Sequence, residues 1–297
     1  MNDLPLPQHM VTRFAPSPTG RLHVGHGWSA LMAMDLARAA GGELHLRIED
    51  IDGTRSRPEH VAGIIEDLRW LGIEWQGEPL FQSQRLGLYD AALDRLRRRG
   101  LVYPCFCTRA GIAAEIAASG SAPHGSEGPV YPGTCRALDP AIRAERLRRG
   151  EPHCWRLDIG RALAETGPLR WRDMDAGEVE ACPGLAGDVV LARKDAPTSY
   201  HLAATVDDAA TGITHILRGV DLRAATDIHR LLQALLGLPS PLYRFHPLLV
   251  DAQGRRLAKR TQGLALAELR AAGADPARLR EDLRACRFPV GIHAASA

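Results

Sequence analysis

The order of predicted elements near the start of the chain restricts the fold most strongly. Residues 11–14 read as a short strand, and they lead into a turn-rich segment, 15–21, that contains two prolines. A helical pattern covers residues 25–40, and residues 43–48 alternate as a second strand before Pro58 opens a second helix. A strand, a helix, a strand and a helix in this order predict a parallel sheet of the α/β class.

A different pattern interrupts the chain after residue 100. Residues 105–190 contain most of the cysteines, a stretch rich in glycine, serine and proline, and short strand-like segments, which together indicate an inserted subdomain. Strand, helix and strand patterns return at 213–217, 226–236 and 245–250, and two short helices are predicted after them. We expect four units: a first half of the sheet at 1–100, the insertion at 101–190, a second half at 191–262 and a short helical tail at 263–297.

The composition is that of an ordinary folded protein. The chain has 297 residues, of which 45% are hydrophobic and 24% are charged, so it can bury a substantial core. It has no run of about 18 apolar residues and no signal peptide, so we expect a cytoplasmic protein without a membrane segment. A net charge of +2 neither requires nor excludes a nucleic-acid partner, although arginines gather at 95–99, 143–149 and 255–260.

Two histidines mark a candidate site after the first strand. His23, Gly25 and His26 lie between the first predicted strand and the first predicted helix, where α/β sheets bind ligands. A glycine admits a phosphate close to the backbone, and a helix N-terminus offers free N–H groups to an anion. The spacing of three residues lets both imidazoles face one phosphate chain. A metal-binding pair and a chance occurrence are the alternatives.

A second candidate segment follows the strand predicted at 245–250. Residues 254–260 read Gly-Arg-Arg-Leu-Ala-Lys-Arg, which is a glycine-led loop dense in positive charge. We expect this loop to approach the same phosphates from the other side, with Lys259 as a point charge on a leaving pyrophosphate. An ordinary basic surface loop is the alternative.

Together, the two segments resemble a known pair of motifs. His-Val-Gly-His at 23–26 and Arg-Leu-Ala-Lys-Arg at 256–260 are similar to the signature motifs of the class I aminoacyl-tRNA synthetases. The second motif departs from the usual form, with Arg256 where lysine is common and with Ala258 and Arg260 in place of serines. The resemblance implies a Rossmann-type core with three catalytic residues, His23, His26 and Lys259. It also implies that these residues and Gly25 bind ATP, which Mg²⁺ accompanies.

The flanking segments narrow the resemblance to glutamate. The segments similar to those of glutamyl-type synthetases are 13–20, 47–52, 199–203, 207–208 and 213–222. Glutamate carries one ammonium group and two carboxylates, so its site needs a carboxylate and guanidinium groups. By resemblance, the residues that bind it are Glu49 for the ammonium group, Arg13, Arg218 and Tyr200 for the side-chain carboxylate, and Ser17 for positioning. Structural roles are the alternatives: Glu49 as a helix cap, Arg218 as a partner of Asp221, and Tyr200 as a core residue.

The length of the chain narrows the family further. Glutamyl-tRNA synthetases carry a large helical anticodon-binding region after the second motif, whereas residues 261–297 follow it here. The chain therefore resembles the truncated branch, the glutamyl-queuosine tRNA(Asp) synthetases. This resemblance implies a monomeric ligase that activates glutamate with ATP and transfers it onto queuosine in the anticodon of tRNA(Asp). A minimal glutamyl-tRNA synthetase that charges the tRNA 3′ end and a non-catalytic tRNA-binding relic are the alternatives.

Four residues of the predicted insertion form a candidate metal site. Cys105, Cys107 and Cys135 would supply three thiolates of a closed tetrahedral zinc site. In the queuosine branch the fourth ligand is a tyrosine oxygen, so the resemblance implies Tyr131. His124 lies in the same segment, so a site of three cysteines and one histidine is an alternative, as are reduced thiols without a metal. We expect the remaining cysteines to be buried apolar residues, namely Cys154, Cys182 and Cys286.

Overall fold

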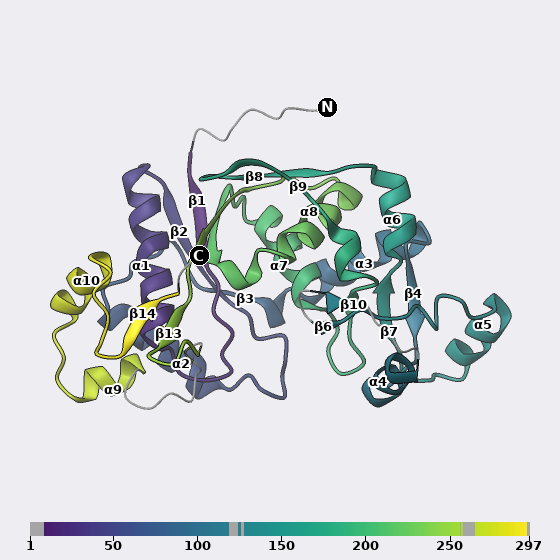
Figure 1. Ribbon diagram of the computed structural model, residues 1–297, viewed down its shortest axis with the longest axis horizontal. Helices are drawn as coiled ribbons and strands as arrows, with labels where there is room; N and C mark the ends of the chain where they lie inside the picture. Colours follow the sequence, from purple (N-terminus) through teal and green to yellow (C-terminus); the bar gives the residue numbers. More distant parts are fainter. Residues whose placement is uncertain (1–8, 119–123, 126–127, 256, 258–264, 296–297) are drawn as a thin grey trace.

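The computed structural model describes residues 9–118, 124–125, 128–255, 257 and 265–295 of the chain (Figure 1). The strand and helix order predicted at the start of the chain is confirmed: β1 is Val11–Phe14, α1 is Val24–Ala39, β2 is Glu43–Ile48 and α2 is Pro58–Trp70. A further short strand, β3 (Leu80–Phe81), was not predicted. β1 pairs with β2, and β2 pairs with β3, both in parallel. Pro58 stands in the first turn of α2, where its missing N–H is not needed.

The second half of the chain continues the same sheet. Its elements are α7 (Tyr200–Ala210), β11 (His215–Gly219), η3 (Val220–Leu222), α8 (Ala225–Leu236) and β12 (Leu242–His246). β11 pairs with β12 in parallel, and the backbone N–H of Thr214 donates to the carbonyl of Val11 at 2.9 Å, so β11 lies beside β1. The parallel strands therefore follow the order β3, β2, β1, β11, β12, which confirms the predicted α/β class.

A smaller antiparallel sheet lies between the two halves in sequence. Its strands are β4 (Val102–Cys105), β7 (Cys154–Leu157) and β10 (Val190–Ala192). The other elements of this region are η1 (Gln82–Gln84), α3 (Leu86–Arg98), α4 (Arg109–Ala118), β5 (His124–Gly125), β6 (Gly128–Pro129), α5 (Pro140–Arg148), α6 (Ile159–Thr166), β8 (Arg170–Asp173), β9 (Gly177–Glu180) and η2 (Pro183–Ala186). The hairpin of β8 and β9 pairs with β12 and so extends the main sheet. The unit boundaries given above stay predictions.

The last part of the chain contains the two predicted short helices, α9 (Leu266–Ala271) and α10 (Pro276–Arg284), and one strand that was not predicted. The single strand expected at 245–250 is wrong, because Pro247 separates β12 from β13 (Leu249–Asp251). β13 pairs in antiparallel fashion with the unexpected strand β14 (Ile292–Ala294). In Figure 1, α9, α10 and β14 lie beside α1 at one end of the molecule, and α4 and α5 lie at the opposite end.

Two apolar clusters hold the layers together. One cluster packs α1 and α2 against β1 and β2, and its buried side chains include Leu31, Leu46 and Leu68. The other packs α3 and α8 against β4, and it includes Leu96 and Leu231. Burying one such side chain stabilises the fold by roughly 1.5–3 kcal/mol. The two clusters therefore fix the positions of the strands whose ends form the site described below. Among the described helices, none is long and apolar enough to span a membrane.

Candidate active site

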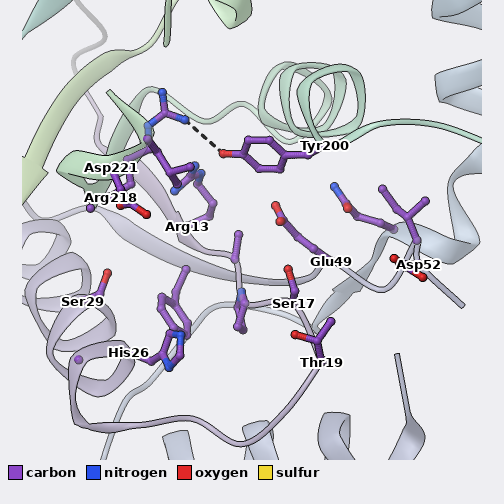
Figure 2. A pocket seen from close by; sticks show the side chains of 18 of the residues that line it. Arg13, Ser17, Thr19, His26, Ser29, Glu49, Asp52, Tyr200, Arg218 and Asp221 are labelled. Carbon is purple, nitrogen blue, oxygen red and sulfur yellow. Dashed lines mark hydrogen bonds between the residues drawn. The ribbon is translucent and has the colours of Figure 1, made fainter. Parts of the chain in front are cut away.

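A cavity of about 770 Å³ opens where β1, β2 and β11 end. The strand order reverses between β1 and β11, and α/β sheets bind ligands at such a point. Figure 2 shows side chains that converge on this cavity from several elements. The predicted residues that line it are Arg13, Ser17, His23, Gly25, His26, Glu49, Tyr200 and Arg218. Lys259 lies outside the described residues, and Leu257, two positions before it, lines the same cavity.

The two predicted histidines cap the N-terminus of α1. His23 is the N-cap residue, and its Nδ1 accepts from the backbone N–H of Gly25 at 3.1 Å. Nδ1 of His26 accepts from the backbone N–H of His23, also at 3.1 Å, and the two ring centroids are 3.7 Å apart. A neutral imidazole that accepts at Nδ1 carries its proton at Nε2, so each ring offers an N–H donor. Such donors at a helix N-terminus suit an anion such as a phosphate group.

Gly25 keeps the His23 ring in this position. A Cβ atom at residue 25 would lie 3.0 Å from Cε1 and 3.1 Å from Nδ1 of His23, and 3.7 Å from a side-chain carbon of Leu249. The first two distances are tighter than ordinary van der Waals contact, so a side chain at residue 25 would press on the ring. The glycine therefore has a packing reason in addition to leaving the backbone accessible to a phosphate.

The segment between β1 and α1 is attached to the end of β2. The backbone N–H of Glu49 donates to the carbonyl of Pro16 at 3.0 Å, and the N–H of Thr19 donates to the carbonyl of Ser17 at 2.9 Å. The side chains of Ser17 and Thr19 line the cavity on the same side as Glu49 (Figure 2).

Three buried charged side chains and the partly buried Glu49 form one network beside the cavity. Oδ1 of Asp208, on α7, accepts from Nε of Arg13 at 3.2 Å and from Nη1 of Arg47 at 2.5 Å. Nη2 of Arg47 donates in turn to Oε1 of Glu49 at 3.0 Å. Arg13 comes from β1 and Arg47 from β2, so the network joins the two halves of the sheet and fixes Glu49 at the cavity wall.

Burial and the two arginines set the ionisation of this network. Burial raises the pKa of Glu49, and the charges of Arg47 and Arg13 offset that rise only in part. Burial acts in the same direction on Asp208, but Arg47 and Arg13 outweigh it and hold the pKa of Asp208 below its usual range. Asp208 is therefore a fixed anion, whereas a further cation beside Glu49 would stabilise its ionised form.

Arg218 is a buried cation on β11, with 4% of its surface exposed. Its Nη2 donates to Oγ1 of Thr226 at 2.5 Å, and its Nη1 donates to the hydroxyl of Tyr200 at 3.3 Å, the dashed line in Figure 2. The guanidinium carbon also lies over the rings of Tyr243 and Phe245, at 5.3 Å and 5.7 Å from their centroids. These contacts orient the guanidinium group without neutralising its charge.

The contacts of these residues argue against the purely structural alternatives. Among the described residues, Arg218 forms no ion pair with a carboxylate, Asp221 included. Glu49 pairs with Arg47 and caps no helix among those described. Tyr200 lines the cavity, and burial raises its pKa, so its hydroxyl keeps the proton. A buried guanidinium without a carboxylate lowers stability, and a ligand carboxylate would relieve that penalty.

Three buried residues around the site were not given a role from the sequence: Asp208, Arg47 and His229. The bonds of Asp208 join it to residues 195 and 161 positions away, so local pattern could not reveal them. Nδ1 of His229 lies 3.4 Å from Nη1 of Arg218. One signal was available, since Asp207 and Asp208 lie in a helix that is otherwise rich in apolar residues, and a buried acid needs a partner.

The four predicted metal ligands come together beside the small antiparallel sheet. The Sγ atoms of Cys105, Cys107 and Cys135 lie within 4.8 Å of one another. The hydroxyl of Tyr131 is 3.4 Å from the sulfur of Cys105 and 3.5 Å from that of Cys107. Separations of this size are compatible with a tetrahedral site that has metal–sulfur bonds of about 2.3 Å. The side chain of His124 lies outside what the structure describes.

The prediction for the other cysteines is only partly correct. Cys154 is buried as expected, whereas Cys182 and Cys286 are exposed. Cys182 immediately precedes η2, and Cys286 follows α10 with a positive φ of 54°, so both lie where the chain turns at the surface. Apolar character alone does not place a cysteine in the core when its backbone belongs to a turn.

Comparisons with known proteins agree with this geometry. Residues 9–292 match the family model described as tRNA synthetases class I (E and Q), catalytic domain. The glutamyl-Q tRNA(Asp) synthetase of Rhodobacter capsulatus is 50% identical over 277 residues, which are 91% of this chain and 98% of the relative. That of Symbiobacterium thermophilum is 46% identical, over 89% of this chain and 82% of the relative. The crystal structure of glutamate-tRNA synthetase from Elizabethkingia anophelis matches with a TM-score of 0.72 at 28% identity, over 85% of this chain and 53% of that one.

Proposed function

Because the chain belongs to the class I tRNA synthetases for glutamate and glutamine, we propose that it activates glutamate with ATP and transfers it onto queuosine in the anticodon of tRNA(Asp). The observation that carries this proposal is the 50% identity to a glutamyl-Q tRNA(Asp) synthetase over 98% of that relative. The chain is a ligase of this family. We further propose that it works as a monomer in the cytoplasm, where ATP, glutamate and tRNA meet.

Glutamate binding in this proposal rests on charge complementarity. The guanidinium of Arg218 and the hydroxyl of Tyr200 bind the side-chain carboxylate, and Glu49 binds the ammonium group. Arg13 uses Nε for Asp208 and Nη1 for the carbonyl of Leu217, which leaves Nη2 to assist Arg218. Ser17 then positions the bound amino acid from the loop after β1. The support is that Arg218 is a buried cation with neutral partners, whereas Glu49 is a partly buried acid whose pKa is raised by desolvation.

The activation step then requires positioning more than covalent catalysis. An oxygen of the glutamate α-carboxylate attacks the α-phosphorus of ATP, the bond to the pyrophosphate breaks, and glutamyl-adenylate forms. The Nε2–H groups of His23 and His26 donate to the phosphate oxygens at the N-terminus of α1, and Lys259 offsets charge on the leaving pyrophosphate. Mg²⁺, which accompanies ATP, would neutralise further phosphate charge. A hydroxyl of queuosine then attacks the activated carbonyl carbon, AMP leaves, and the hydroxyl proton is released.

We also propose a structural zinc ion held by Cys105, Cys107, Cys135 and Tyr131. Bound there, zinc would cross-link the end of β4 to the segment at 131–135. The test is metal analysis of protein purified without chelators. Zinc near one ion per chain, lost together with thermal stability in Cys135→Ser but kept in the control Cys182→Ser, supports the site. Protein that stays folded and free of zinc in zinc-supplemented medium contradicts it.

The experiment for the main proposal is transfer of labelled glutamate to defined RNAs. The acceptors are tRNA(Asp) with queuosine, tRNA(Asp) with unmodified guanosine, and tRNA(Glu), with nuclease mapping of the label. We expect label in the anticodon loop of the queuosine-bearing tRNA alone. Label at the 3′ end of tRNA(Glu) would instead make the protein a minimal glutamyl-tRNA synthetase.

Pyrophosphate exchange separates both enzymes from a non-catalytic tRNA-binding protein. The assay contains millimolar glutamate and Mg²⁺-ATP without tRNA, because adenylate formation in this proposal needs no RNA. Exchange that depends on glutamate supports an activating enzyme. Its absence with folded protein and with tRNA added would overturn the proposed chemistry.

A further inference from the structure

His229 is a buried histidine that the proposed mechanism does not use. It lies on α8, is 1% exposed, and does not line the cavity. Its neighbours on the helix include Ile228, Leu231 and Leu232, which belong to an apolar cluster. A polar ring beside these apolar side chains needs a hydrogen-bonding explanation.

The contacts of His229 point to Arg218. Its Nδ1 lies 3.4 Å from Nη1 of Arg218, and its ring centroid lies 5.4 Å from those of both Tyr200 and His201. A guanidinium group can only donate, so Nδ1 of His229 accepts and the ring carries its proton at Nε2. Burial, followed by the charge of Arg218, holds the pKa of His229 well below its usual value, so the ring is neutral.

The second ring nitrogen of His229 is buried as well. Among the described residues, the buried Nε2 has no hydrogen-bond partner. A buried polar group without a partner lowers the stability of the fold. Within the described part of the chain, His229 therefore makes one long side-chain hydrogen bond, to Arg218, and that contact is the one that can explain a histidine here.

We propose that His229 is a positioning residue that orients the guanidinium of Arg218 toward a ligand carboxylate, an inference that rests on the proposed glutamate site. Arg218 is held by three neutral acceptors: Thr226 and His229 from α8, and Tyr200 from α7. Neutral acceptors fix the plane of the group and leave its positive charge available. An acidic residue at position 229 would bond the same nitrogen but would neutralise the charge and compete with the carboxylate of the substrate.

Three near-isosteric substitutions test this inference by calorimetric titration with glutamate. His229→Asn keeps a neutral acceptor, and we expect affinity within about threefold of wild type. His229→Leu removes the acceptor and should weaken glutamate binding on the order of tenfold. His229→Asp should weaken it by about a hundredfold or more, because Arg218 is then neutralised. In pyrophosphate exchange, the KM for ATP should stay unchanged in all three variants.

The order of the three variants distinguishes positioning from packing. If His229 served packing alone, the variants with the lowest melting temperature would also bind glutamate most weakly. If it positions Arg218, the His229→Asp variant can keep a high melting temperature and still bind glutamate poorly, because its aspartate pairs with Arg218. His215→Asn is the matched control, because His215 is a buried histidine of β11 that contacts Thr214 and does not line the cavity. We expect that control to lower stability without changing glutamate affinity.

The outcomes separate this inference from the proposed function. Wild-type affinity in folded His229→Leu and His229→Asp would overturn the inference, as would loss of binding in His229→Asn equal to that in His229→Asp. Wild-type protein that binds glutamate but shows no exchange would contradict the proposed function alone, and the titration series would still decide the role of His229. Wild-type protein that binds no glutamate would overturn both.

Discussion

At the scale of single residues, the buried charge of Arg218 lowers the stability of the fold and should raise the affinity for glutamate. It is 4% exposed, and its bonds to described residues go to neutral acceptors. Methionine has a similar shape without the charge, and replacing a buried charge by an apolar group is often neutral for stability. We expect Arg218→Met to keep its Tm within about 5 °C of wild type. Glutamate affinity should fall about a hundredfold, because charge-assisted hydrogen bonds are lost.

Calorimetric titration with glutamate and a thermal melt of the same sample check this prediction. Arg244→Met is the matched control, because Arg244 is an exposed arginine of the neighbouring strand β12 that pairs with Asp175. The control should leave both glutamate affinity and Tm nearly unchanged. A fall of more than about 10 °C in the Tm of Arg218→Met would mean that the arginine mainly serves the fold.

The glutamate-binding residues predicted from the sequence all face the cavity. Arg13, Glu49 and Tyr200 were recognised because they lie in segments that resemble known motifs, and the structure brings them together around one space. Asp208 and His229 do not line the cavity and instead contact the arginines that do. Their roles depend on burial and on partners from other elements, which hydropathy along one segment does not reveal. The catalytic roles of the cavity residues stay predictions until they are tested.

At the scale of elements, a substitution at the N-terminus of α1 should change the KM for ATP without lowering the stability of the helix. Alanine is favoured over glycine in a helix by about 1 kcal/mol, so Gly25→Ala should not destabilise α1. The new Cβ would, however, lie 3.0 Å from Cε1 of His23 and press on that ring. We expect the KM for ATP in pyrophosphate exchange to rise about tenfold, because the displacement weakens a phosphate donor. Glutamate affinity should not change.

The matched control for this substitution lies in α2. Gly63 is partly exposed, and a Cβ atom there would have nothing within 4 Å. Gly63→Ala should therefore stabilise its helix by up to about 1 kcal/mol and leave the KM for ATP as in wild type. An unchanged KM for ATP in Gly25→Ala would show that the His23 ring does not contact the nucleotide.

A second element, α9, is attached to α2 through Arg270. Arg270 lies 3.1 Å from the buried Asp67 and 2.7 Å from the exposed Glu66. Burial raises the pKa of Asp67 to about 6, which is above its unfolded value, and Arg270 offsets this only in part. Protonated Asp67 therefore contributes favourably to the free energy of unfolding. This contribution is present in full below about pH 4 and is lost as the pH rises through about 6. Asparagine cannot ionise, so Asp67→Asn should not lose stability over this pH range. At pH 8 the variant should be more stable than wild type by up to roughly 3 kcal/mol.

Urea unfolding between about pH 4.5 and pH 8 measures this difference. The advantage of Asp67→Asn over wild type should shrink as the pH falls. Glu66→Gln, which changes the exposed partner, should alter stability by less than about 1 kcal/mol at every pH. If Asp67→Asn is the less stable protein at pH 8, then the ion pair with Arg270 outweighs the penalty of burying Asp67.

Elements with a strong local pattern were predicted well, and elements that depend on distant pairing were not. The strands at 11–14 and 43–48 have the predicted bounds. In the second strand the buried Leu44, Leu46 and Ile48 show in the alternation. In the first strand the burial of Thr12 and Arg13 does not show in any apolar pattern. The strand predicted at 245–250 is split by Pro247, and β13 then pairs with β14 about 40 residues later. A strand of three residues such as β14 has too little pattern of its own to be recognised.

At the scale of the whole molecule, the end of the described chain returns to the phosphate side of the cavity. β14 pairs with β13, and the backbone N–H of Ala295 donates to the carbonyl of Leu248 at 2.7 Å. The ring of Phe288 lies 5.0 Å from that of Trp28 on α1. β13 precedes the basic loop that carries Lys259, so these contacts fix one end of the loop next to α1.

Deleting residues 287–297 should therefore affect stability and ATP use together, with little effect on glutamate. Loss of Phe288 and of the β13–β14 pairing removes roughly 3–5 kcal/mol, or on the order of 10 °C in Tm. The KM for ATP should rise because β13 loses its partner, whereas Arg218 and Tyr200 on the other half of the sheet are untouched. Val290→Ser, at a fully exposed position of the same segment, is the control and should behave as wild type. Equal losses of ATP and glutamate binding in the folded deletion variant would show that the segment supports the whole cavity and not its phosphate side.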